Sequence, residues 1–456
     1  MKVEVAVIGA GTAGLAAYRE AAKHTDSVVL IEGGPHGTTC ARVGCMPSKL
    51  LIAAADAAHE VKKADEFGVR ATVASIDGRD VMQRVRSERD RFVGFVLEGV
   101  DNIPEHHKLR GYAQFIDGNR LQVNEQIIEA DRIVIATGSS PAVPKPLQAA
   151  GDRLIINDNV FDWQDLPESV AVFGAGVIGL ELGQALARLG VRTKLFSIGG
   201  FVGPLTDPEV KASALAALQD DFYFDPDART EVRQDGDQVI VRYQRDEEWH
   251  EEAFDYLLAA TGRKPNLDKL NLSAAGIELD DKGMPAYDAD TLQIGKLPIF
   301  LAGDVNNDRP LLHEAADEGV IAGRNAISYP LVQGQPRRTP ISVVFSDPQI
   351  MMVGKTYAQI IDEDVAIGQV SFANQGRSRV MLVNQGMLRV YGDRHTGKLI
   401  GAEMAGPSAE HIAHLLSWAI QQGQTVEQLL RMPFYHPVIE EGVRTALRDL
   451  AQALKN

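Results

Sequence analysis

The sequence predicts an α/β fold, because one pattern of strand, glycine-rich turn, helix and strand occurs twice in a chain of 456 residues. The first copy is VEVAVIGAGTAGLAAYREAAKHTDSVVLIE, and the second is SVAVFGAGVIGLELGQALARLGVRTKLFS. A third segment, RTPISVVFSDPQIMMVG, alternates as strands do, and two amphipathic helices, PSAEHIAHLLSWAIQQG and EEGVRTALRDLAQALKN, follow it. Together these observations predict two α/β domains followed by an α+β C-terminal domain.

Composition restricts the possible partners. Apolar residues make up 45% and charged residues 24%, as in ordinary globular proteins, and the formal net charge is -16. An acidic chain without a basic run argues against nucleic acid or an anionic membrane as its partner. The N-terminus alternates before its glycines, unlike a signal peptide, and no apolar run reaches the roughly 18 residues of a membrane span. We therefore expect a cytoplasmic protein.

The first copy carries the fingerprint G-x-G-x-x-G at Gly9, Gly11 and Gly14, and Glu32 ends its second strand. The first glycine permits a tight turn, and the second lets a pyrophosphate approach the amides at the helix N-terminus. Glu32 is placed to accept hydrogen bonds from ribose hydroxyls. A lone fingerprint is weak evidence, but the strands, helix and acid together favour dinucleotide binding over a purely structural turn.

The second fingerprint consists of Gly174, Gly176 and Gly179. Gly9 and Glu32 are 23 positions apart, and the same step from Gly174 reaches Ser197. A hydroxyl neither binds a ribose 2′-hydroxyl as strongly as a carboxylate nor repels a 2′-phosphate, and Ile198–Gly200 offers no arginine for that phosphate. The sequence thus predicts two Rossmann-like dinucleotide-binding domains, with NAD(H) favoured in the second and NADP(H) possible.

The two cysteines of the chain, Cys40 and Cys45, lie five positions apart in CARVGCMPSKLL. A regular helix rises about 7.5 Å over five residues, and a disulfide needs Cα atoms within about 7 Å, so a regular helix across the pair fits badly. Gly44 allows a distorted turn and Pro47 suits the start of a helix, which places Cys45 near a helix N-terminus and favours its thiolate. A redox pair is favoured; a structural disulfide and a metal pair with His36 are the alternatives.

These motifs resemble, in order and over essentially the whole chain, the flavin-dependent pyridine nucleotide-disulfide oxidoreductases. The resemblance also rests on ATG in RIVIATGSSP and in YLLAATGRKPN, on AGDV and on HPVIEE. It implies FAD in the first domain, a nicotinamide cofactor in the second, and a C-terminal dimerisation domain in a homodimer with shared active sites. The expected regions are an FAD domain at 1–142, an NAD(P) domain at 143–264, a central segment completing the FAD domain at 265–334, and the dimerisation domain at 335–456.

The resemblance assigns redox roles near the cysteines. Cys45 would be the thiolate against the flavin, and Cys40 the thiol that exchanges with substrate. Lys49 would lie near the reactive nitrogen of the flavin, paired with Glu181, because a buried lysine left alone would be costly. The alternative for Lys49 is a solvated helix lysine.

The resemblance also implies an acid/base pair at the C-terminus. His436 would take the proton from a dithiol, and Glu441 would hold the tautomer of its ring. In this family the pair comes from the partner subunit. Taken alone, His436 would be interpreted as a structural histidine.

Further positions match the cofactor-binding residues of the family. For FAD they are Gly9, Gly11, Gly14, Glu32, Lys49, Ala113, Gly138, Asp304 and His313. For the nicotinamide cofactor they are Gly174, Gly176, Gly179, Glu181, Ser197 and Gly262. Asp304 would bond the ribityl chain, although alone it would be interpreted as a helix-capping aspartate. No metal site is predicted.

Four features depart from the usual pattern of the family. Thr38 stands where glycine is common, Arg42 where asparagine is common and Val438 where threonine is common, and FSDPQ at 345–349 replaces Thr-x-Pro-Glu. Arg42 would lower a thiol pKa or contact an acidic substrate. The departures bear on substrate choice and leave the flavin-disulfide chemistry unchanged.

The chain lacks a C-terminal cysteine pair, a third redox centre and the NADPH-binding arginines that glutathione reductases carry on the second fingerprint. This favours the branch of the family that oxidises free or protein-bound dihydrolipoyl groups with NAD+, and a place in a 2-oxoacid dehydrogenase complex is possible. The alternative is a divergent NAD(P)H-dependent reductase of a glutathione-like disulfide, a quinone or a metal. Another class, a flavin-bearing redox sensor or complex-assembly subunit, would have no use for His436 and Glu441.

Overall fold

The structure is a computed structural model in which residues 1–455 are described. By internal contacts the chain divides into two compact units, each assembled from separate stretches. Unit 1 comprises Met1–Pro47, Arg84–Ala142 and Arg263–Arg337, and unit 2 comprises Ser48–Gln83, Val143–Gly262 and Arg338–Asn456. The four regions expected from the sequence follow motifs rather than contacts, and their boundaries stay a prediction.

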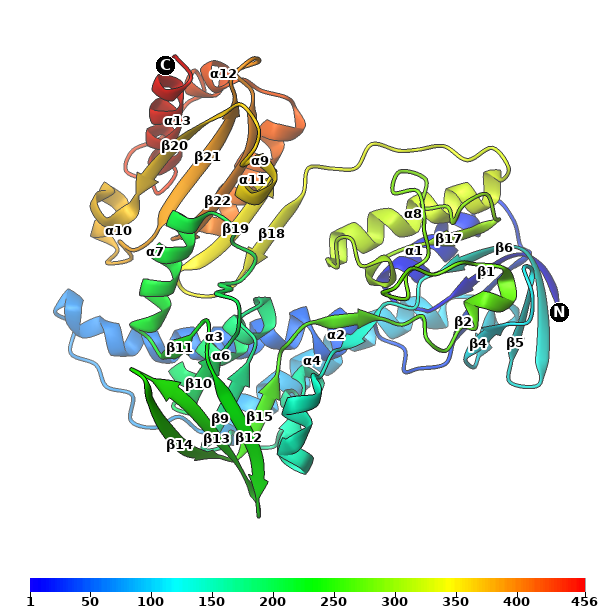
Figure 1. The fold of residues 1–456 in the computed structure, drawn as a ribbon, viewed down its shortest axis with the longest axis horizontal. Coiled ribbons are helices and arrows are strands. Elements are labelled where there is room, and N and C mark those ends of the chain that lie inside the picture. Colours follow the sequence, from blue (N-terminus) through cyan, green and yellow to red (C-terminus); the bar gives the residue numbers. More distant parts are fainter. Residues whose placement is uncertain (456) are drawn as a thin grey trace. The chain divides into compact units, whose positions relative to one another are not determined.

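Unit 1 is built on a mixed sheet with the strand order β3-β2-β1-β6-β5-β4, in which β17 also pairs with β6 (Figure 1). Its strands are β1 (Lys2–Ile8), β2 (Val28–Glu32), β3 (Lys108–Arg110), β4 (Ala113–Phe115), β5 (Arg120–Val123), β6 (Gln126–Ile135) and β17 (Ile299–Leu301). The strands β3, β2, β1, β6 and β17 run parallel. Their apolar residues are buried on both faces, as a parallel sheet with helices on its faces requires.

The helices that lie wholly or partly in unit 1 are α1 (Thr12–Ala21), α2 (Thr39–Val43), α3 (Cys45–Lys63), α4 (Gly78–Asp101) and α8 (Leu312–Ser328). α1 and α8 pack closely because glycines of α8 face the backbone of α1. A Cβ on Gly319 would lie 2.2 Å from the carbonyl oxygen of Ala13, and one on Gly323 would lie 2.6 Å from that of Ala17. A short ladder of β7 (Ser139–Pro141) and β16 (Arg263–Pro265) also belongs to this unit.

Unit 2 contains a parallel sheet with the order β11-β10-β9-β15-β8, which repeats the order β3-β2-β1-β6 of unit 1. Its elements are β8 (Leu154–Ile155), α5 (Asn157–Val160), β9 (Ser169–Phe173), α6 (Val177–Arg188), β10 (Arg192–Phe196), α7 (Pro208–Gln219), β11 (Tyr223–Asp225) and β15 (Tyr256–Ala259). The repeated order, with a helix between the first two strands of each copy, confirms the predicted pair of Rossmann-like domains.

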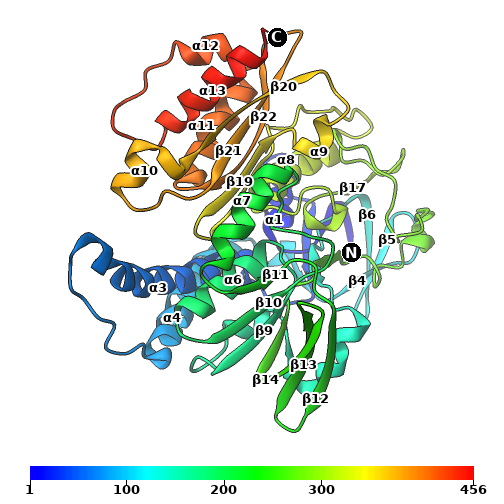
Figure 2. The same cartoon turned by 60° about the vertical axis from the view of Figure 1, so that its left-hand side comes forward.

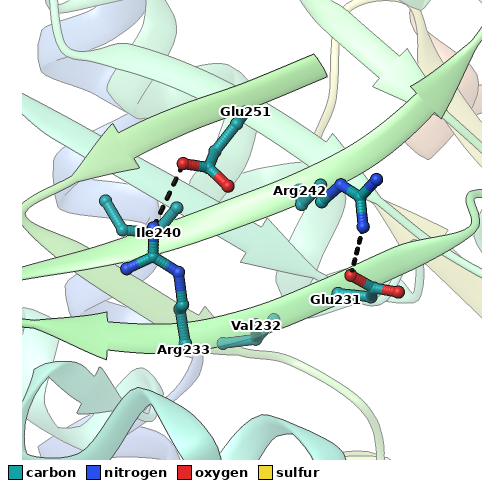
Figure 3. Close-up of a pocket in the computed structure, with 6 residues that line it drawn as sticks. All are labelled: Glu231, Val232, Arg233, Ile240, Arg242 and Glu251. Atoms are coloured by element: carbon teal, nitrogen blue, oxygen red, sulfur yellow. Dashed lines mark hydrogen bonds and ion pairs between the residues drawn. The ribbon is translucent and has the colours of Figure 1, made fainter. Parts of the chain in front are cut away.

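An antiparallel sheet of β12 (Thr230–Asp235), β13 (Gln238–Arg245) and β14 (Glu248–Phe254) follows β11. Figure 3 shows its outer face, where Arg242 donates to Glu231 over 2.9 Å and Arg233 donates to Glu251 over 3.1 Å. These side chains line a hollow of about 380 Å³. Because its four charges pair with one another across the strands, the hollow is a feature of sheet stabilisation.

The C-terminal part of unit 2 is an antiparallel sheet with the order β18-β19-β22-β21-β20, beside which lie α11 and α13 (Figure 2). Its elements are β18 (Ile341–Val344), β19 (Gln349–Gly354), α9 (Tyr357–Ile360), β20 (Val365–Ser371), α10 (Gly376–Val380), β21 (Met387–Asp393), β22 (Leu399–Gly406), α11 (Ala409–Gln421), α12 (Val426–Leu430) and α13 (Glu441–Ala453). The predicted strands and both predicted amphipathic helices are confirmed. Within residues 1–455, no helix has the length and apolar character that a membrane crossing requires.

Two fully buried carboxylates join α7 to the C-terminal sheet. Asp207 lies at the N-terminus of α7. Arg389 donates to both of its carboxylate oxygens, each over 2.8 Å, and the Tyr391 hydroxyl donates to one of them over 2.9 Å. Glu403, on β22, accepts from the amide of Asp207 over 2.9 Å and from the amide of Thr206 over 2.7 Å. Burial and the two carboxylates raise the pKa of Tyr391 far above its usual value. The second Rossmann-like domain and the C-terminal sheet therefore share one buried polar network.

We expect Gly319→Ala to destabilise the protein by about 1–3 kcal/mol, because the added methyl group collides with a backbone carbonyl that cannot move independently. The matched control is Gly94→Ala in α4, where the added carbon meets no atom of residues 1–455 within 4 Å other than its chain neighbours and the adjacent backbone of its own helix. Higher helix propensity should raise stability there by up to about 1 kcal/mol. The measurement is the midpoint of urea unfolding; equal shifts in both variants would contradict the close packing of α1 on α8.

Candidate active site

The two glycine turns have the same backbone geometry. Gly9 and Gly174 both have φ of +105°, a region that side chains rarely adopt. A Cβ on Gly14 would lie 1.8 Å from the carbonyl oxygen of Gly9, and one on Gly179 would lie 1.8 Å from that of Gly174. The first and third glycines of each fingerprint are therefore required by the fold of the turn itself.

The middle glycines leave room for a ligand. Gly11 precedes α1 and Gly176 precedes α6, and glycine has no side chain that could cap the helix amides. Apart from the glycine itself and its two chain neighbours, no atom of residues 1–455 lies within 4 Å of the position that a Cβ on either glycine would take. Open space at the positive end of a helix suits a phosphate. Both turns therefore fit the pyrophosphate that FAD and nicotinamide dinucleotides share.

At the end of β2, Glu32 holds the loops of the first site. Its Oε2 accepts from the amide of Ala10, inside the glycine turn, over 2.7 Å, and its Oε1 accepts from the amide of Gly34 over 2.7 Å. At the end of β10, Ser197 Oγ accepts from the amide of Ala175 over 3.3 Å. The two residues that the 23-position spacing paired thus make equivalent contacts to their glycine turns.

Asp304 lies in a short 3-10 helix, η5 (Asp304–Asn306), directly after β17 and Gly303. Its Oδ2 accepts from the hydroxyl of Ser139 over 3.0 Å, and Arg263 donates to the same hydroxyl over 2.8 Å. The N-cap of the following helix α8 is Leu311, so Asp304 does not cap that helix. Of the other predicted FAD positions, Ala113 is buried at the start of β4, Gly138 has positive φ after β6, and His313 is exposed in α8.

A buried cluster that sequence inspection did not predict fixes the turn before Asp304. Glu318 accepts from the amide of Gly303 over 2.6 Å and from Asn306 over 2.7 Å. Arg337 donates to Glu318 and to Glu314, each over 2.7 Å. Burial raises the pKa of Glu318, and the Gly303 amide and Arg337 oppose that rise. The contacts connect residues far apart in the chain, and no local motif signals them.

The cysteine segment is two helices separated by a sharp kink. α2 ends at Val43 and α3 begins at Cys45, which confirms that Cys45 lies at a helix N-terminus, two residues before Pro47. Gly44, between the helices, has φ of -128° and ψ of -118°, and a Cβ there would lie 3.1 Å from the carbonyl oxygen of Thr39. Cys40 is half-buried and Cys45 is exposed. The kink replaces the regular helix that would not fit a disulfide.

Two of the departures from the family pattern flank Cys40. Thr38 has φ of +58°, and a β-branched residue in that region carries strain of about 1–3 kcal/mol. Its hydroxyl accepts from the amide of Ala41 over 3.3 Å and so caps α2. Arg42 lies in the last turn of α2, with its aliphatic carbons beside Gly37. The local backbone at the cysteines is therefore held by a strained cap.

The predicted pair of Lys49 and Glu181 is present within unit 2. Lys49 Nζ lies 2.8 and 2.7 Å from the two carboxylate oxygens of Glu181, which is buried. The amide of Phe345 donates to Glu181 Oε1 over 3.0 Å, and the Phe345 ring lies 4.6 Å from Lys49 Nζ. The Ser48 hydroxyl adds a contact of 3.4 Å to Glu181. The FSDPQ segment thus supplies both an amide and a ring to this ion pair, while the role of the pair toward a flavin stays a prediction.

The predicted pair of His436 and Glu441 is also present within unit 2. His436 Nδ1 donates to Glu441 Oε2 over 2.9 Å, and the histidine side chain is 80% exposed. Arg444 donates to the other oxygen of Glu441 over 2.7 Å. Partial desolvation acts to raise the pKa of Glu441, but the bonds from His436 and the Val438 amide and the charge of Arg444 hold that pKa below its usual value. With Nδ1 engaged, Nε2 is the nitrogen that can accept a proton.

The predicted residues fall into two sets by unit. Unit 1 holds Gly9, Gly11, Gly14, Glu32, Cys40, Cys45, Ala113, Gly138, Asp304 and His313, and unit 2 holds Lys49, Gly174, Gly176, Gly179, Glu181, Ser197, Gly262, His436 and Glu441. Each set contains one complete nucleotide turn. The assignment of these residues to cofactors stays a prediction.

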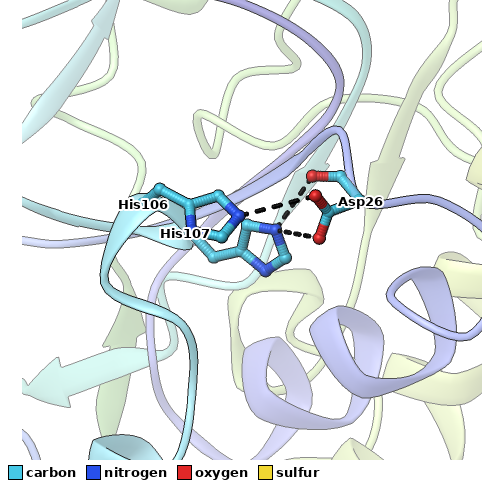
Figure 4. Close-up of side chains that lie close together, drawn as sticks. All are labelled: Asp26, His106 and His107. Carbon is cyan, nitrogen blue, oxygen red and sulfur yellow. Dashed lines mark hydrogen bonds and ion pairs between the residues drawn. The ribbon is translucent and has the colours of Figure 1, made fainter.

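A cluster of possible metal ligands, Asp26, His106 and His107, lies in unit 1 (Figure 4). His106 Nε2 is 3.6 Å from a carboxylate oxygen of Asp26, and His107 Nε2 is 3.1 Å from the other. The buried His107 is engaged on both nitrogens, however, because Nδ1 contacts the Tyr18 hydroxyl and Nε2 contacts the Asp26 carbonyl, each over 2.8 Å. Its geometry is that of a histidine that ties the loop before β2 to α1.

The sequence matches two family descriptions. Residues 3–319 match "Pyridine nucleotide-disulphide oxidoreductase", and residues 340–447 match "Pyridine nucleotide-disulphide oxidoreductase, dimerisation domain". The first match includes both glycine turns and the cysteine pair, and the second includes His436 and Glu441.

Curated relatives match over nearly their full length. The dihydrolipoyl dehydrogenase of Haloferax volcanii is 30% identical, covering 99% of this chain and 97% of its own. The dihydrolipoyl dehydrogenase of Geobacillus stearothermophilus is also 30% identical, covering 97% of this chain and 94% of its own.

Two solved structures share the fold. LpdA of Mycobacterium tuberculosis superimposes with a TM-score of 0.82 at 24% identity, covering 98% of this chain and 99% of its own. The Cu(II) complex of the HOCl-induced flavoprotein disulfide reductase RclA of Escherichia coli superimposes with a TM-score of 0.82 at 23% identity and the same coverage. At these identities the two structures establish the fold alone.

We expect Glu441 to titrate below the usual glutamate pKa of about 4.3. A lowered pKa means that the native protein binds this proton less readily than the unfolded chain, so the contribution of Glu441 to stability is present at neutral pH and is lost as pH falls through its native pKa. Carboxyl ¹³C NMR measures the pKa of Glu441, and Glu441→Gln assigns its resonance. In His436→Ala the midpoint of the Glu441 titration should rise toward the usual glutamate pKa; an unchanged midpoint would contradict the hydrogen bond from His436 as a cause.

Proposed function

The chain belongs to the pyridine nucleotide-disulphide oxidoreductases, FAD-dependent oxidoreductases that use a pyridine nucleotide, and from this membership we propose that it oxidises dihydrolipoyl groups with NAD+. The substrate is supported by relatives named dihydrolipoyl dehydrogenase that match 97–99% of the chain. The observation that carries the dithiol chemistry is the exposed His436 ring held by Glu441, which presents Nε2 as a base.

The reaction proposed for the cysteine pair is thiol–disulfide exchange. His436 Nε2 takes a proton from a dihydrolipoyl thiol, and the resulting thiolate attacks Cys40 Sγ of a Cys40–Cys45 disulfide. Cys45 leaves as a thiolate, which the N-terminus of α3 stabilises. The second substrate thiol loses its proton to solvent and attacks the substrate sulfur of the mixed disulfide. Cys40 leaves as a thiolate, the cyclic lipoyl disulfide departs, and both electrons stay on the cysteine pair.

The cofactor sites would link the cysteines to NAD+. The glycine turn of α1 with Glu32 and Asp304 would hold FAD, which supplies the two-electron chemistry between a dithiol and a nicotinamide. The glycine turn of α6 would hold the nicotinamide dinucleotide by its pyrophosphate. Lys49, held in place by Glu181, would present its ammonium group to the flavin.

The proposed assembly is a homodimer with shared active sites. The match of residues 340–447 to the dimerisation domain supports the dimer. His436 and Glu441 would serve the cysteine pair of the partner subunit. A place for the dimer in a 2-oxoacid dehydrogenase complex is part of the proposal, since lipoyl groups are carried there on a partner protein.

Reduction of a different acceptor is the second candidate. The observations that favour it are the substitutions Thr38 and Arg42 beside Cys40, which alter the surface that a disulfide substrate meets. The acceptor would be a glutathione-like disulfide, a quinone or a metal ion, and the RclA structure contains Cu(II). A redox sensor without turnover is a third possibility from another class.

Steady-state assays test the function. Dihydrolipoamide with NAD+ should give turnover on the order of 1–10³ s⁻¹, and Cys40→Ser and Cys45→Ser should each abolish it while FAD remains bound. Parallel assays compare lipoamide with glutathione disulfide, a quinone and Cu(II) as acceptors, each with NADH and with NADPH. Faster reduction of one of these than of lipoamide would sink the lipoyl substrate and leave the family chemistry intact; no turnover with any would favour the sensor.

His436→Gln should lower kcat with dihydrolipoamide by about 10²–10⁴-fold, because a general base is lost. Mixed dimers test the sharing of sites. A dimer of one Cys45→Ser chain and one His436→Gln chain retains one intact cysteine pair facing one intact histidine only if the site is shared. An equal statistical mixture should regain about a quarter of wild-type activity. Activity that stays at the level of the separate variants would show that each chain uses its own histidine.

A further inference from the structure

The loop after β2 in unit 1 is held by one carboxylate at two places. Glu32 accepts from the amide of Ala10 in the glycine turn and from the amide of Gly34, two positions after Glu32 itself. A carboxylate in this position binds the ribose hydroxyls of a dinucleotide and disfavours a 2′-phosphate.

In unit 2 the same two contacts are divided between two residues. Ser197 Oγ accepts from the amide of Ala175 in the glycine turn. The amide of Gly199, two positions after Ser197, donates to Asp227 Oδ1 over 2.8 Å. Asp227 thus brings a carboxylate to the loop whose own strand ends in a hydroxyl. Asp227 itself lies in a different part of the chain, the loop after β11.

Backbone hydrogen bonds fix Asp227 in this place. The amide of Ser197 donates to the carbonyl of Asp225 over 2.8 Å, and the amide of Ala228 donates back to the carbonyl of Ser197 over 2.7 Å. The amide of Gly200 donates to the carbonyl of Pro226 over 3.0 Å. The segments 197–200 and 225–228 therefore run side by side as a continuation of the β10–β11 pairing, which makes the position of the Asp227 carboxylate a property of the sheet.

We propose that Asp227 is a specificity-determining residue that makes the second nucleotide site select NAD(H) over NADP(H). The inference rests on the proposed function of that site, and it corrects the weight given to Ser197, whose hydroxyl alone leaves the choice open. Asp227 acts in two ways. Its charge repels a 2′-phosphate at the end of β10, and its oxygen occupies the Gly199 amide that would otherwise be a donor for that phosphate.

The surrounding charges reinforce Asp227. It lines a hollow of about 580 Å³ together with Asp225, Arg229, Gln244, Asp246 and Glu247. Four carboxylates against one guanidinium give this surface a formal charge of -3. A phosphate carrying close to two negative charges would thus meet an acidic surface. Arg229 is the one cation among the described residues that line this hollow, and four carboxylates line it as well.

The test compares ADP-ribose with 2′-phospho-ADP-ribose, which differ only in the phosphate, by isothermal titration calorimetry on the FAD-loaded dimer. The wild type should bind ADP-ribose at least about tenfold more tightly than 2′-phospho-ADP-ribose. Asp227→Asn keeps an oxygen for the Gly199 amide and removes only the charge. In this variant the ratio of the two dissociation constants should fall about tenfold, because 2′-phospho-ADP-ribose binds more tightly. Added salt should also lower that ratio in the wild type, because it screens the charge of Asp227.

The matched control is Asp246→Asn, which removes one charge from the same hollow. Asp246 makes an ion pair of 3.6 Å with Arg245 and is not a partner of the Gly199 amide. Asp246→Asn should change the ratio of the two dissociation constants less than about threefold. Equal effects of the two variants, or no effect of Asp227→Asn, would overturn the role of Asp227 and leave the proposed function standing. Failure of the wild type to bind either ligand would overturn both.

Discussion

The contact between the third glycine of each fingerprint and the carbonyl of the first glycine is the constraint on which both nucleotide sites depend. A Cβ at Gly14 or Gly179 would overlap that carbonyl at 1.8 Å, so the helix can start this close to its strand only with glycine there. The close start aims the first amides of α1 and α6 at the open space beside Gly11 and Gly176. The charge of the helix N-terminus is therefore available to a ligand in both units.

Much of the site could be predicted because its signals are local or periodic. The glycine turns, the strands before them and the helix that starts at Cys45 follow from spacing and residue type within short windows. The pairs Lys49–Glu181 and His436–Glu441 follow only from resemblance. The first joins residues 132 positions apart, so no short window contains both, and a lone histidine such as His436 would be interpreted as structural. Asp227 and Glu318 were missed, since each acts on an amide brought near it by strand pairing or helix packing.

Buried acids recur as the means by which the fold fixes backbone turns. Glu318 holds the turn before Asp304, and Glu181 binds the amide of Phe345 as well as Lys49. Each carboxylate accepts from amides that have no partner within a helix or strand, and an arginine or lysine offsets the cost of burying its charge. Glu318 lies outside the sequence motifs, whereas Glu181 is one of the positions that match the family, so a motif can mark such an acid but does not mark all of them.

The network of Asp207, Arg389, Tyr391 and Glu403 has a consequence for chimeric proteins. A crossover between this chain and a relative at the start of the dimerisation domain would separate α7 from the strands whose side chains satisfy it. The resulting hybrid would bury Asp207 opposite residues selected for another helix. Recombination within this family should therefore succeed most often when the nicotinamide domain and the C-terminal sheet are inherited from one parent as a single block.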